Sequence, residues 1–169
     1  MDALQLRSRQ APLKELYQKD PAQARLTMRA EAVVDFSRLT CRQVLPTSDP
    51  APEAGLHPMA GGAEQSACAG ELLLQSLTAC AGVTLAAVKT AMGLEIEHAR
   101  IVASGTMDFR GTLGISRDVP VGLSDIQLEF QLKSAASPEQ LDKLIQVTER
   151  CCVVLQTLRN SVPITSRRL

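Results

Sequence analysis

Residues 69–92 read AGELLLQSLTACAGVTLAAVKTAM and give the strongest helical signal in the chain. One series of residues recurs at steps of three and four, the spacing that brings side chains to one face of an α-helix. Gly93 follows, and glycine is favoured just beyond the last helical turn. The pattern therefore predicts one long helix that stops at Gly93. The recurring positions are Leu73, Leu77, Cys80, Thr84, Val88 and Ala91.

A second helix is predicted over residues 137–159. Its start, Ser137-Pro138-Glu139-Gln140, combines an N-cap serine, a proline at the first helical position and a glutamine three residues after the cap. The helix carries the adjacent pair Cys151 and Cys152, which point about 100° apart. Because each of the two is in phase with apolar neighbours, periodicity leaves open which one faces the first helix.

Strand-like stretches surround the two predicted helices. Residues 25–36 alternate apolar and polar side chains with period two, and residues 39–45 follow across a turn, which predicts a hairpin. Two longer strands are predicted at residues 95–109 and 125–133, joined by a turn-rich linker. The hairpin-like links favour an α+β fold with antiparallel pairing over a parallel doubly wound sheet.

The remaining segments are predicted from their breaker residues. Residues 46–66 are too rich in proline and glycine for regular structure. Pro12 lies within the helix-like start of the chain and is expected to begin a second short helix. We expect residues 1–24 to form a helical arm, residues 25–169 to form the main domain, and residues 162–165 to add a short edge strand.

Composition excludes several classes of function. The 169 residues suit one compact domain, and 18 basic against 18 acidic residues leave a formal charge of zero. A binder of nucleic-acid backbones needs a basic excess on one face, and a base-stacking surface needs aromatic residues, of which this chain has Tyr17 and three phenylalanines. We therefore expect no nucleic-acid partner.

We also expect a cytoplasmic protein without a membrane span. The apolar stretch at residues 72–88 is interrupted by polar residues and falls short of the ~20 apolar residues that a span needs. The first residues have no apolar secretory core. Five cysteines without a regular spacing are then thiols, redox groups or metal ligands rather than structural disulfides.

Two interpretations of the helix-borne cysteines follow from the residues alone. If the two helices pack together, Cys80 and one thiol of the Cys151-Cys152 pair come within disulfide reach, which requires Cα atoms closer than ~7 Å. Alternatively, each is a small buried residue of the core. No Cys-x-x-Cys or paired-histidine spacing supports zinc, so we expect no metal and no cofactor.

The two cysteine-bearing helices resemble those of a known family. The segment ELLLQSLTAC at residues 71–80 is similar to the first-cysteine helix of the superfamily of osmotically induced protein C (OsmC) and organic hydroperoxide resistance proteins. The segment ERCCVVLQTL at residues 149–158 is similar to its second-cysteine helix, with Cys152 at the family's cysteine position. The resemblance covers about residues 25–166.

The resemblance implies an intertwined homodimer with a six-stranded antiparallel sheet wrapped around two central helices. It also implies a peroxidase, in which the Cys80 thiolate attacks an organic hydroperoxide and Cys152 condenses with the resulting sulfenic acid. An external thiol then reduces the disulfide. Apolar neighbours of the two cysteines would suit an alkyl or lipid chain; these are Leu73, Leu77, Val83, Val153 and Leu155.

Activation of Cys80 needs a nearby positive group. In the well-studied branch of the family this group is an arginine of the first hairpin, held by a glutamate ten residues before the first cysteine. Here position 70 is Gly70 and the carboxylate is Glu71, which either takes over that role or favours the start of the helix. Arg38 is the best candidate for the cation, and Arg29 and Arg42 are weaker candidates. The alternative function is a non-catalytic dimeric module that binds a small hydrophobic ligand.

Overall fold

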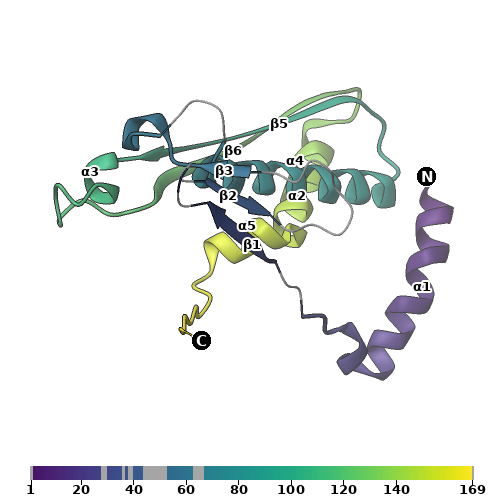
Figure 1. Cartoon of the computed structure of the whole chain (residues 1–169). Helices are drawn as coiled ribbons and strands as arrows, with labels where there is room; N and C mark the ends of the chain where they lie inside the picture. Colours follow the sequence, from purple (N-terminus) through teal and green to yellow (C-terminus); the bar gives the residue numbers. More distant parts are fainter. Residues whose placement is uncertain are drawn as a thin grey trace. The chain divides into compact units, whose positions relative to one another are not determined.

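A computed structural model describes residues 2–27, 30–35, 37, 40–43, 53–62 and 67–168, with backbone only at positions 40, 42 and 43. The chain is mixed α and β (Figure 1). It divides into two compact units. Unit 1 comprises Met1–Glu15, Ser76–Ala103 and Leu128–Leu169, and unit 2 comprises Leu16–Gln75 and Ser104–Gln127. The helices are α1 (Ala3–Lys19), α2 (Ala69–Met92), α3 (Phe109–Thr112), α4 (Pro138–Cys151) and α5 (Val153–Arg159), with 3-10 turns η1 (Pro21–Ala24) and η2 (Pro58–Ala60). The strands are β1 (Ala32–Asp35), β2 (Thr40–Gln43), β3 (Glu53–Gly55), β4 (Ala67–Cys68), β5 (Ile96–Met107) and β6 (Leu123–Ser134).

The core of unit 1 is built around α2 and α4. The prediction of a helix over residues 69–92 is confirmed, and Gly93 ends it with a φ of +67°, a left-handed conformation that glycine adopts without strain. Leu85 of α2, Leu94 after it and Leu144 of α4 form one buried cluster. Six partly buried residues pack against this cluster: Val88, Ile96, Ile101, Phe130, Leu132 and Ala136.

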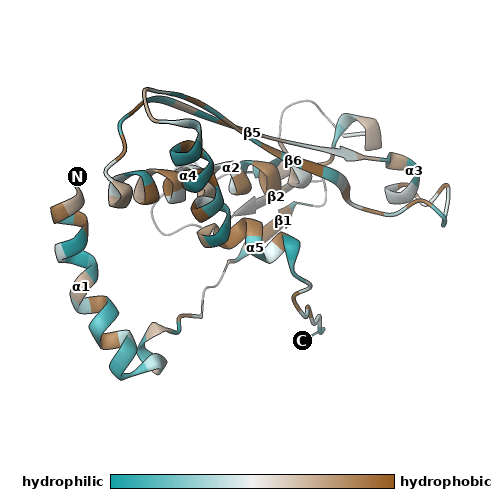
Figure 2. Cartoon of the chain, turned by 180° about the vertical axis from the view of Figure 1, so that it is seen from behind, coloured by the Kyte–Doolittle hydropathy of each residue, from teal (hydrophilic) through white to brown (hydrophobic). Residues whose placement is uncertain are grey.

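Helix α2 is apolar over much of its circumference, and brown predominates along it in Figure 2. Its buried residues are nevertheless only Leu77, Ala81 and Leu85. Within the described residues it is the one helix long and apolar enough to cross a membrane, contrary to the expectation that this stretch is too short and polar. The core helix of a soluble protein can have the same length and composition as a membrane-spanning helix. In either case the exposed apolar residues of α2 need another surface to cover them.

The second predicted helix is interrupted, contrary to the expectation of one helix over residues 137–159. Its start is as predicted, because Ser137 and Gln140 form a reciprocal capping box. At Cys152, however, the backbone leaves the helical region with φ −74° and ψ 107°, so that α4 ends at Cys151 and α5 begins at Val153. No proline or glycine marks this break in the sequence.

The four-stranded sheet of unit 2 differs in part from the predicted hairpin. Strands β1 and β2 pair antiparallel as predicted, with Asp35 opposite Thr40, but both are shorter than expected. The predicted irregular region at residues 46–66 in fact contains β3, which pairs antiparallel with β2, and η2. Strand β4 pairs parallel with β3, so the sheet is not wholly antiparallel.

Strands β5 and β6 form a second, two-stranded sheet close to the predicted ranges. They run antiparallel, because the Ser134 hydroxyl donates to the Glu95 carbonyl near one end and the Ser124 hydroxyl to the Thr106 carbonyl near the other. The linker between them begins with the short helix α3, which was not predicted.

Two further predictions about local structure are wrong. Helix α1 continues through Pro12 instead of dividing there. Residues 160–168 contain no strand, so the expected edge strand at residues 162–165 is absent. Both regions are exposed, and local sequence signals there are not reinforced by packing. The division into an arm at residues 1–24 and a main domain at residues 25–169 stays a prediction.

Candidate thiol site

Cys80 and Cys152 are neighbours within unit 1, near enough for each thiol to shift the pKa of the other. Cys80 lies on α2 and is half-buried, whereas Cys152 lies at the break between α4 and α5 and has no exposed surface. Cys151, the last residue of α4, is exposed. The structure therefore resolves the choice that periodicity left open, since Cys152 and not Cys151 meets Cys80.

Tight packing of small and apolar residues holds the two thiols together. Leu77 and Ala81, on α2, are fully buried, as are Leu144 and Thr148 on α4. The alanine lets the neighbouring backbone approach α2 closely, and protein interiors of this density resist displacement of side chains. The relative position of Cys80 and Cys152 is thus fixed by buried residues rather than by exposed loops.

The pKa of the Cys80 thiol is lowered, although burial by itself would raise it. The backbone N–H of Val154 lowers it most, followed by the Cys152 side chain and the backbone N–H of Val153, all of which favour the thiolate. These N–H groups belong to the first turn of α5, where no preceding turn supplies an acceptor. The break at Cys152 therefore supplies donors to the Cys80 sulfur.

Thr84 makes the smallest contribution to the lowered pKa of Cys80. Its hydroxyl has one hydrogen, which it donates to the Cys80 carbonyl oxygen at 2.8 Å. Only when this hydrogen turns from the carbonyl to the sulfur does Thr84 stabilise the thiolate.

The pKa of Cys152 is raised, in the opposite direction. Burial is the main cause, and the adjacent Cys80 sulfur adds to it because two thiolates in contact repel each other. The backbone N–H groups of Leu155 and Val154 oppose these effects without overcoming them. Cys80 is therefore the thiol that ionises first, and Cys152 the one that keeps its proton.

We predict that alkylation of Cys80 by iodoacetamide reaches half its maximal rate at a pH below the ordinary cysteine pKa of about 8.5. Only the thiolate reacts, so the rate rises with pH through the lowered pKa and then levels off. The measurement is the rate of label incorporation into the Cys80 peptide between pH 5 and 10, with glutathione as the control thiol. A midpoint for Cys80 at or above that of glutathione would contradict the assignment.

Glu71 is engaged at the start of α2. Its carboxylate accepts a hydrogen bond from the Cys68 N–H at 2.8 Å, while the Cys68 Sγ accepts one from the Gly70 N–H at 3.3 Å. This is a reciprocal cap in which a thiol stands where serine or threonine is usual. The contact fits the helix-start interpretation of Glu71.

The predicted activating arginines are not part of the described site. Arg38 and Arg29 lie outside the described residues, and only the backbone of Arg42 is described. The activating groups that the structure does show are the Val153 and Val154 N–H groups, which sequence analysis missed. Every residue except proline carries such a group, so no residue type could have indicated them.

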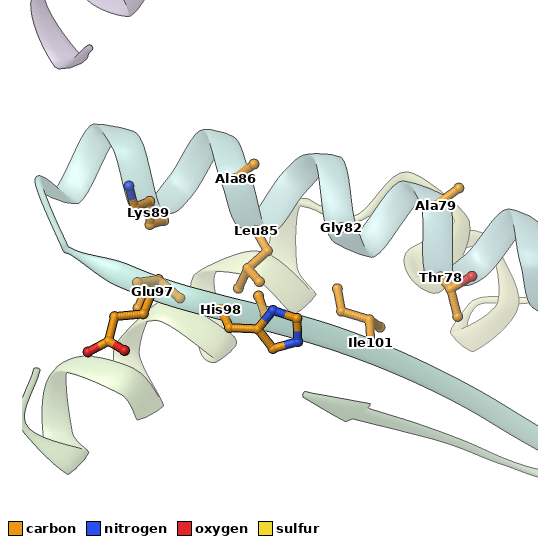
Figure 3. A pocket seen from close by; sticks show the side chains of 11 residues that line it. Thr78, Ala79, Gly82, Leu85, Ala86, Lys89, Glu97, His98 and Ile101 are labelled. Atoms are coloured by element: carbon orange, nitrogen blue, oxygen red, sulfur yellow. The ribbon is translucent and has the colours of Figure 1, made fainter. Parts of the chain in front are cut away.

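Within the described residues, no group of three or more histidine, cysteine, aspartate or glutamate side chains could hold a metal ion. His57 caps η2 by accepting the Met59 N–H at 3.1 Å, and its ring lies 4.8 Å from that of Phe109. His98 lines a cavity (Figure 3).

That cavity has a volume of about 610 Å³ and lies between α2 and β5 within unit 1. Its walls are mainly apolar, with Leu85 and Ile101 among them, and Lys89 and His98 add polar groups (Figure 3). Cys80 does not line it. At about 100° per residue, Cys80 lies roughly 160° around α2 from Gly82, which is in the cavity wall. This cavity is thus separate from the thiol pair.

The surroundings of the Cys80 sulfur are apolar and partly open. Val83, one turn along α2, and Val153, whose N–H reaches the sulfur, are 73% and 68% exposed. Leu77 and Leu155, predicted to line the same site, are buried at 0% and 7% exposure and support it from within. An apolar group that approaches Cys80 would therefore meet two exposed valines.

Comparison with known proteins identifies the family. The profile described as OsmC-like protein matches residues 61–167, more than half of the chain. The chain belongs to the OsmC-like family. The family resemblance seen in the sequence is thereby confirmed, whereas none of the curated proteins matches this OsmC-like chain.

Solved structures share the fold at low sequence identity. An OsmC-like protein from Mycoplasma pneumoniae is 17% identical, with 79% of this chain and 88% of that chain covered and a TM-score of 0.65. An organic hydroperoxide resistance protein from Elizabethkingia anophelis is 15% identical, with coverages of 80% and 91% and a TM-score of 0.63. An organic hydroperoxide resistance protein OsmC from Legionella pneumophila is 11% identical, with coverages of 80% and 92% and a TM-score of 0.61. These likenesses establish the OsmC-like fold of the chain.

Proposed function

We propose that this OsmC-like protein is a thiol-dependent peroxidase that reduces organic hydroperoxides, with Cys80 as the nucleophile and Cys152 as the resolving thiol. The observation that carries the proposal is the pair of neighbouring thiols, in which the half-buried thiol has the lowered pKa and the fully buried thiol the raised one. Two neighbours in fold are organic hydroperoxide resistance proteins, which supports the same chemistry.

The reaction proceeds in three balanced steps. The Cys80 thiolate attacks one peroxide oxygen, the O–O bond breaks, and the alkoxide leaves and takes up a proton to become an alcohol. The Cys152 thiol then displaces hydroxide from the Cys80 sulfenic acid, which forms a disulfide and releases water. An external thiol reductant supplies the two electrons that return both residues to thiols.

An organic peroxide suits the surroundings of Cys80 better than hydrogen peroxide. Val83 and Val153 present exposed apolar surface beside the sulfur, and an alkyl or aryl substituent gains free energy by covering it. Contact over about 60 Å² of apolar surface is worth roughly 1.5 kcal/mol, or about tenfold in rate constant, if it is retained in the transition state.

We propose further that the protein acts as a homodimer. Helix α2 is apolar on several faces but buries only three residues within one chain, so much of its apolar surface needs a cover. A second copy of the chain would supply one. The measurement is the molar mass in solution, for which we expect twice the mass of 18.2 kDa.

A second candidate function rests on the cavity between α2 and β5. Its volume of about 610 Å³ falls in the range of ligand pockets, and its mainly apolar walls suit a small hydrophobic ligand. In this alternative the cysteines are packing residues and the protein binds without catalysis. The two candidates differ in whether any thiol is consumed by peroxide.

The test of the proposed function is peroxide consumption by the purified protein with dithiothreitol as reductant. We expect many turnovers with cumene hydroperoxide, at about ten times the rate constant for hydrogen peroxide because of the apolar contacts at Val83 and Val153. Buffer with dithiothreitol alone gives the background rate. No consumption above that background would contradict the proposal and favour the binding module.

A further inference from the structure

The exposed thiol of Cys151 has no part in the three steps above, although it is next to the resolving cysteine in the chain. We infer that Cys151 is an exit thiol, which attacks the Cys152 sulfur of the Cys80–Cys152 disulfide and moves the disulfide to the protein surface as a Cys151–Cys152 pair. The inference rests on the proposed function, because it states how the Cys80–Cys152 disulfide formed in that reaction is reduced.

Accessibility is the first argument. Thiol–disulfide exchange requires a thiolate to reach one of the two sulfur atoms. The Cys152 side chain has no exposed surface, and Cys80 is only half-buried. A bulky external reductant therefore cannot reach the Cys152 sulfur, whereas Cys151 is attached to it through one peptide bond and is itself exposed.

The backbone at the helix break is the second argument. In a continuous helix, adjacent side chains point about 100° apart and a bond between their sulfur atoms would require the helix to open. Here the peptide that joins the two cysteines lies at the end of α4, where a helix opens most easily, although Cys152 itself keeps a helical φ of −74°. Adjacent Cα atoms are about 3.8 Å apart, less than the usual disulfide range of about 4.4–6.8 Å, so the Cys151–Cys152 ring is strained. A strained and exposed disulfide is readily reduced, which suits a short-lived intermediate.

The leaving group supports the same direction of attack. Attack on the Cys152 sulfur expels Cys80, whose pKa is lowered, whereas attack on the Cys80 sulfur expels Cys152, whose pKa is raised. The thiol with the lower pKa leaves faster. Attack on the buried Cys152 sulfur is thus faster than attack on the Cys80 sulfur. Cys151 is the thiol placed next to that buried sulfur in the chain.

The exchange is balanced without an added oxidant. The Cys151 thiolate forms a bond to the Cys152 sulfur, the Cys80–Cys152 bond breaks, and Cys80 leaves as a thiolate that is ready for another peroxide. An external dithiol then gives two electrons and two protons to the Cys151–Cys152 pair and becomes a disulfide itself. Reduction takes place at the surface while Cys80 stays in its half-buried site.

The experiment begins from a disulfide made without peroxide. Wild type, Cys151→Ser, Cys151→Ala and the matched control Cys68→Ser are oxidised with diamide and then mixed with reduced thioredoxin as a bulky dithiol. Samples are quenched with acid and labelled with N-ethylmaleimide. Cleavage after Arg42, Lys89, Arg150 and Arg159 separates the Cys80 peptide, residues 43–89, from the peptide of residues 151–159, which holds Cys151 and Cys152. Residues 43–89 also hold Cys68, whose contribution the Cys68→Ser control removes.

We expect wild type and Cys68→Ser to show, during reduction, an unlabelled 151–159 peptide that is two hydrogens lighter than the dithiol and no longer linked to residues 43–89. Both Cys151 variants should lack this species and be reduced about tenfold more slowly. Reduction of the Cys151 variants at the wild-type rate would overturn the exit-thiol role, as would the absence of a Cys80–Cys152 link after diamide.

A separate arm distinguishes this inference from the proposed function. Reduced wild type and Cys151→Ser each receive one equivalent of cumene hydroperoxide, and both should consume it at the same rate because Cys151 acts only after the disulfide has formed. If neither consumes peroxide, the peroxidase proposal fails, while the diamide arm still decides whether Cys151 relays the disulfide.

Discussion

Replacement of Cys80 by serine should reduce the rate of cumene hydroperoxide consumption by about a thousandfold or more, to that of the buffer control. A serine hydroxyl does not ionise near neutral pH, so the backbone N–H groups of Val153 and Val154 have no thiolate to stabilise. The measurement is peroxide loss with dithiothreitol as reductant. Because serine is close to cysteine in size, the fold of unit 1 should be kept.

The matched variant Cys152→Ser should separate the first chemical step from the second. It retains Cys80, so one equivalent of peroxide should still be consumed, but the sulfenic acid at Cys80 then has no resolving thiol. Dimedone should label Cys80 in this variant and not in wild type. Cys68→Ser keeps an N-cap oxygen at the start of α2 and should behave as wild type. Unchanged peroxide loss in both Cys80→Ser and Cys152→Ser would rule out the proposed enzyme.

Replacement of Leu144 by alanine should lower the free energy of unfolding by about 2–5 kcal/mol. Leu144 has no exposed surface and joins α4 to Leu85 and Leu94, so the truncated side chain leaves a cavity at the centre of unit 1. The measurement is urea unfolding followed by circular dichroism. The loss is large against a typical domain stability of about 5–15 kcal/mol.

The control for Leu144→Ala is Ile164→Ala, a truncation of an apolar side chain that is 91% exposed. Its effect should stay within about 0.5 kcal/mol, since little buried surface is lost. Equal effects of the two substitutions would contradict the position of the core. Leu144→Ala could lose stability as expected and still keep the pH midpoint of Cys80 alkylation. That result would show that residues other than Leu144 hold the two thiols in place.

Local sequence signals were sufficient where one segment alone decides the structure. The spacing of apolar residues over 69–92 and the glycine at position 93 predicted α2, and Ser137 with Gln140 predicted the start of α4. The same signals failed where pairing with a distant strand matters. Residues 53–55 form a strand because β2 and β4 lie on either side of them, although their surroundings are rich in breakers.

The sequence by itself determined the family, the long apolar helix that carries Cys80 and the capped start of the helix that leads to Cys152, because these follow from residue types at fixed spacing. The family resemblance implied Cys152, rather than Cys151, as the partner of Cys80, where periodicity left the choice open. Only the tertiary structure decided that backbone N–H groups lower the pKa of Cys80. The physical reason lies in the break at Cys152, which no proline or glycine announces. Packing against α2 decides which side chain points inward at this break. Every residue except proline carries a backbone N–H group, so only its position in the folded chain makes it a donor to the Cys80 sulfur.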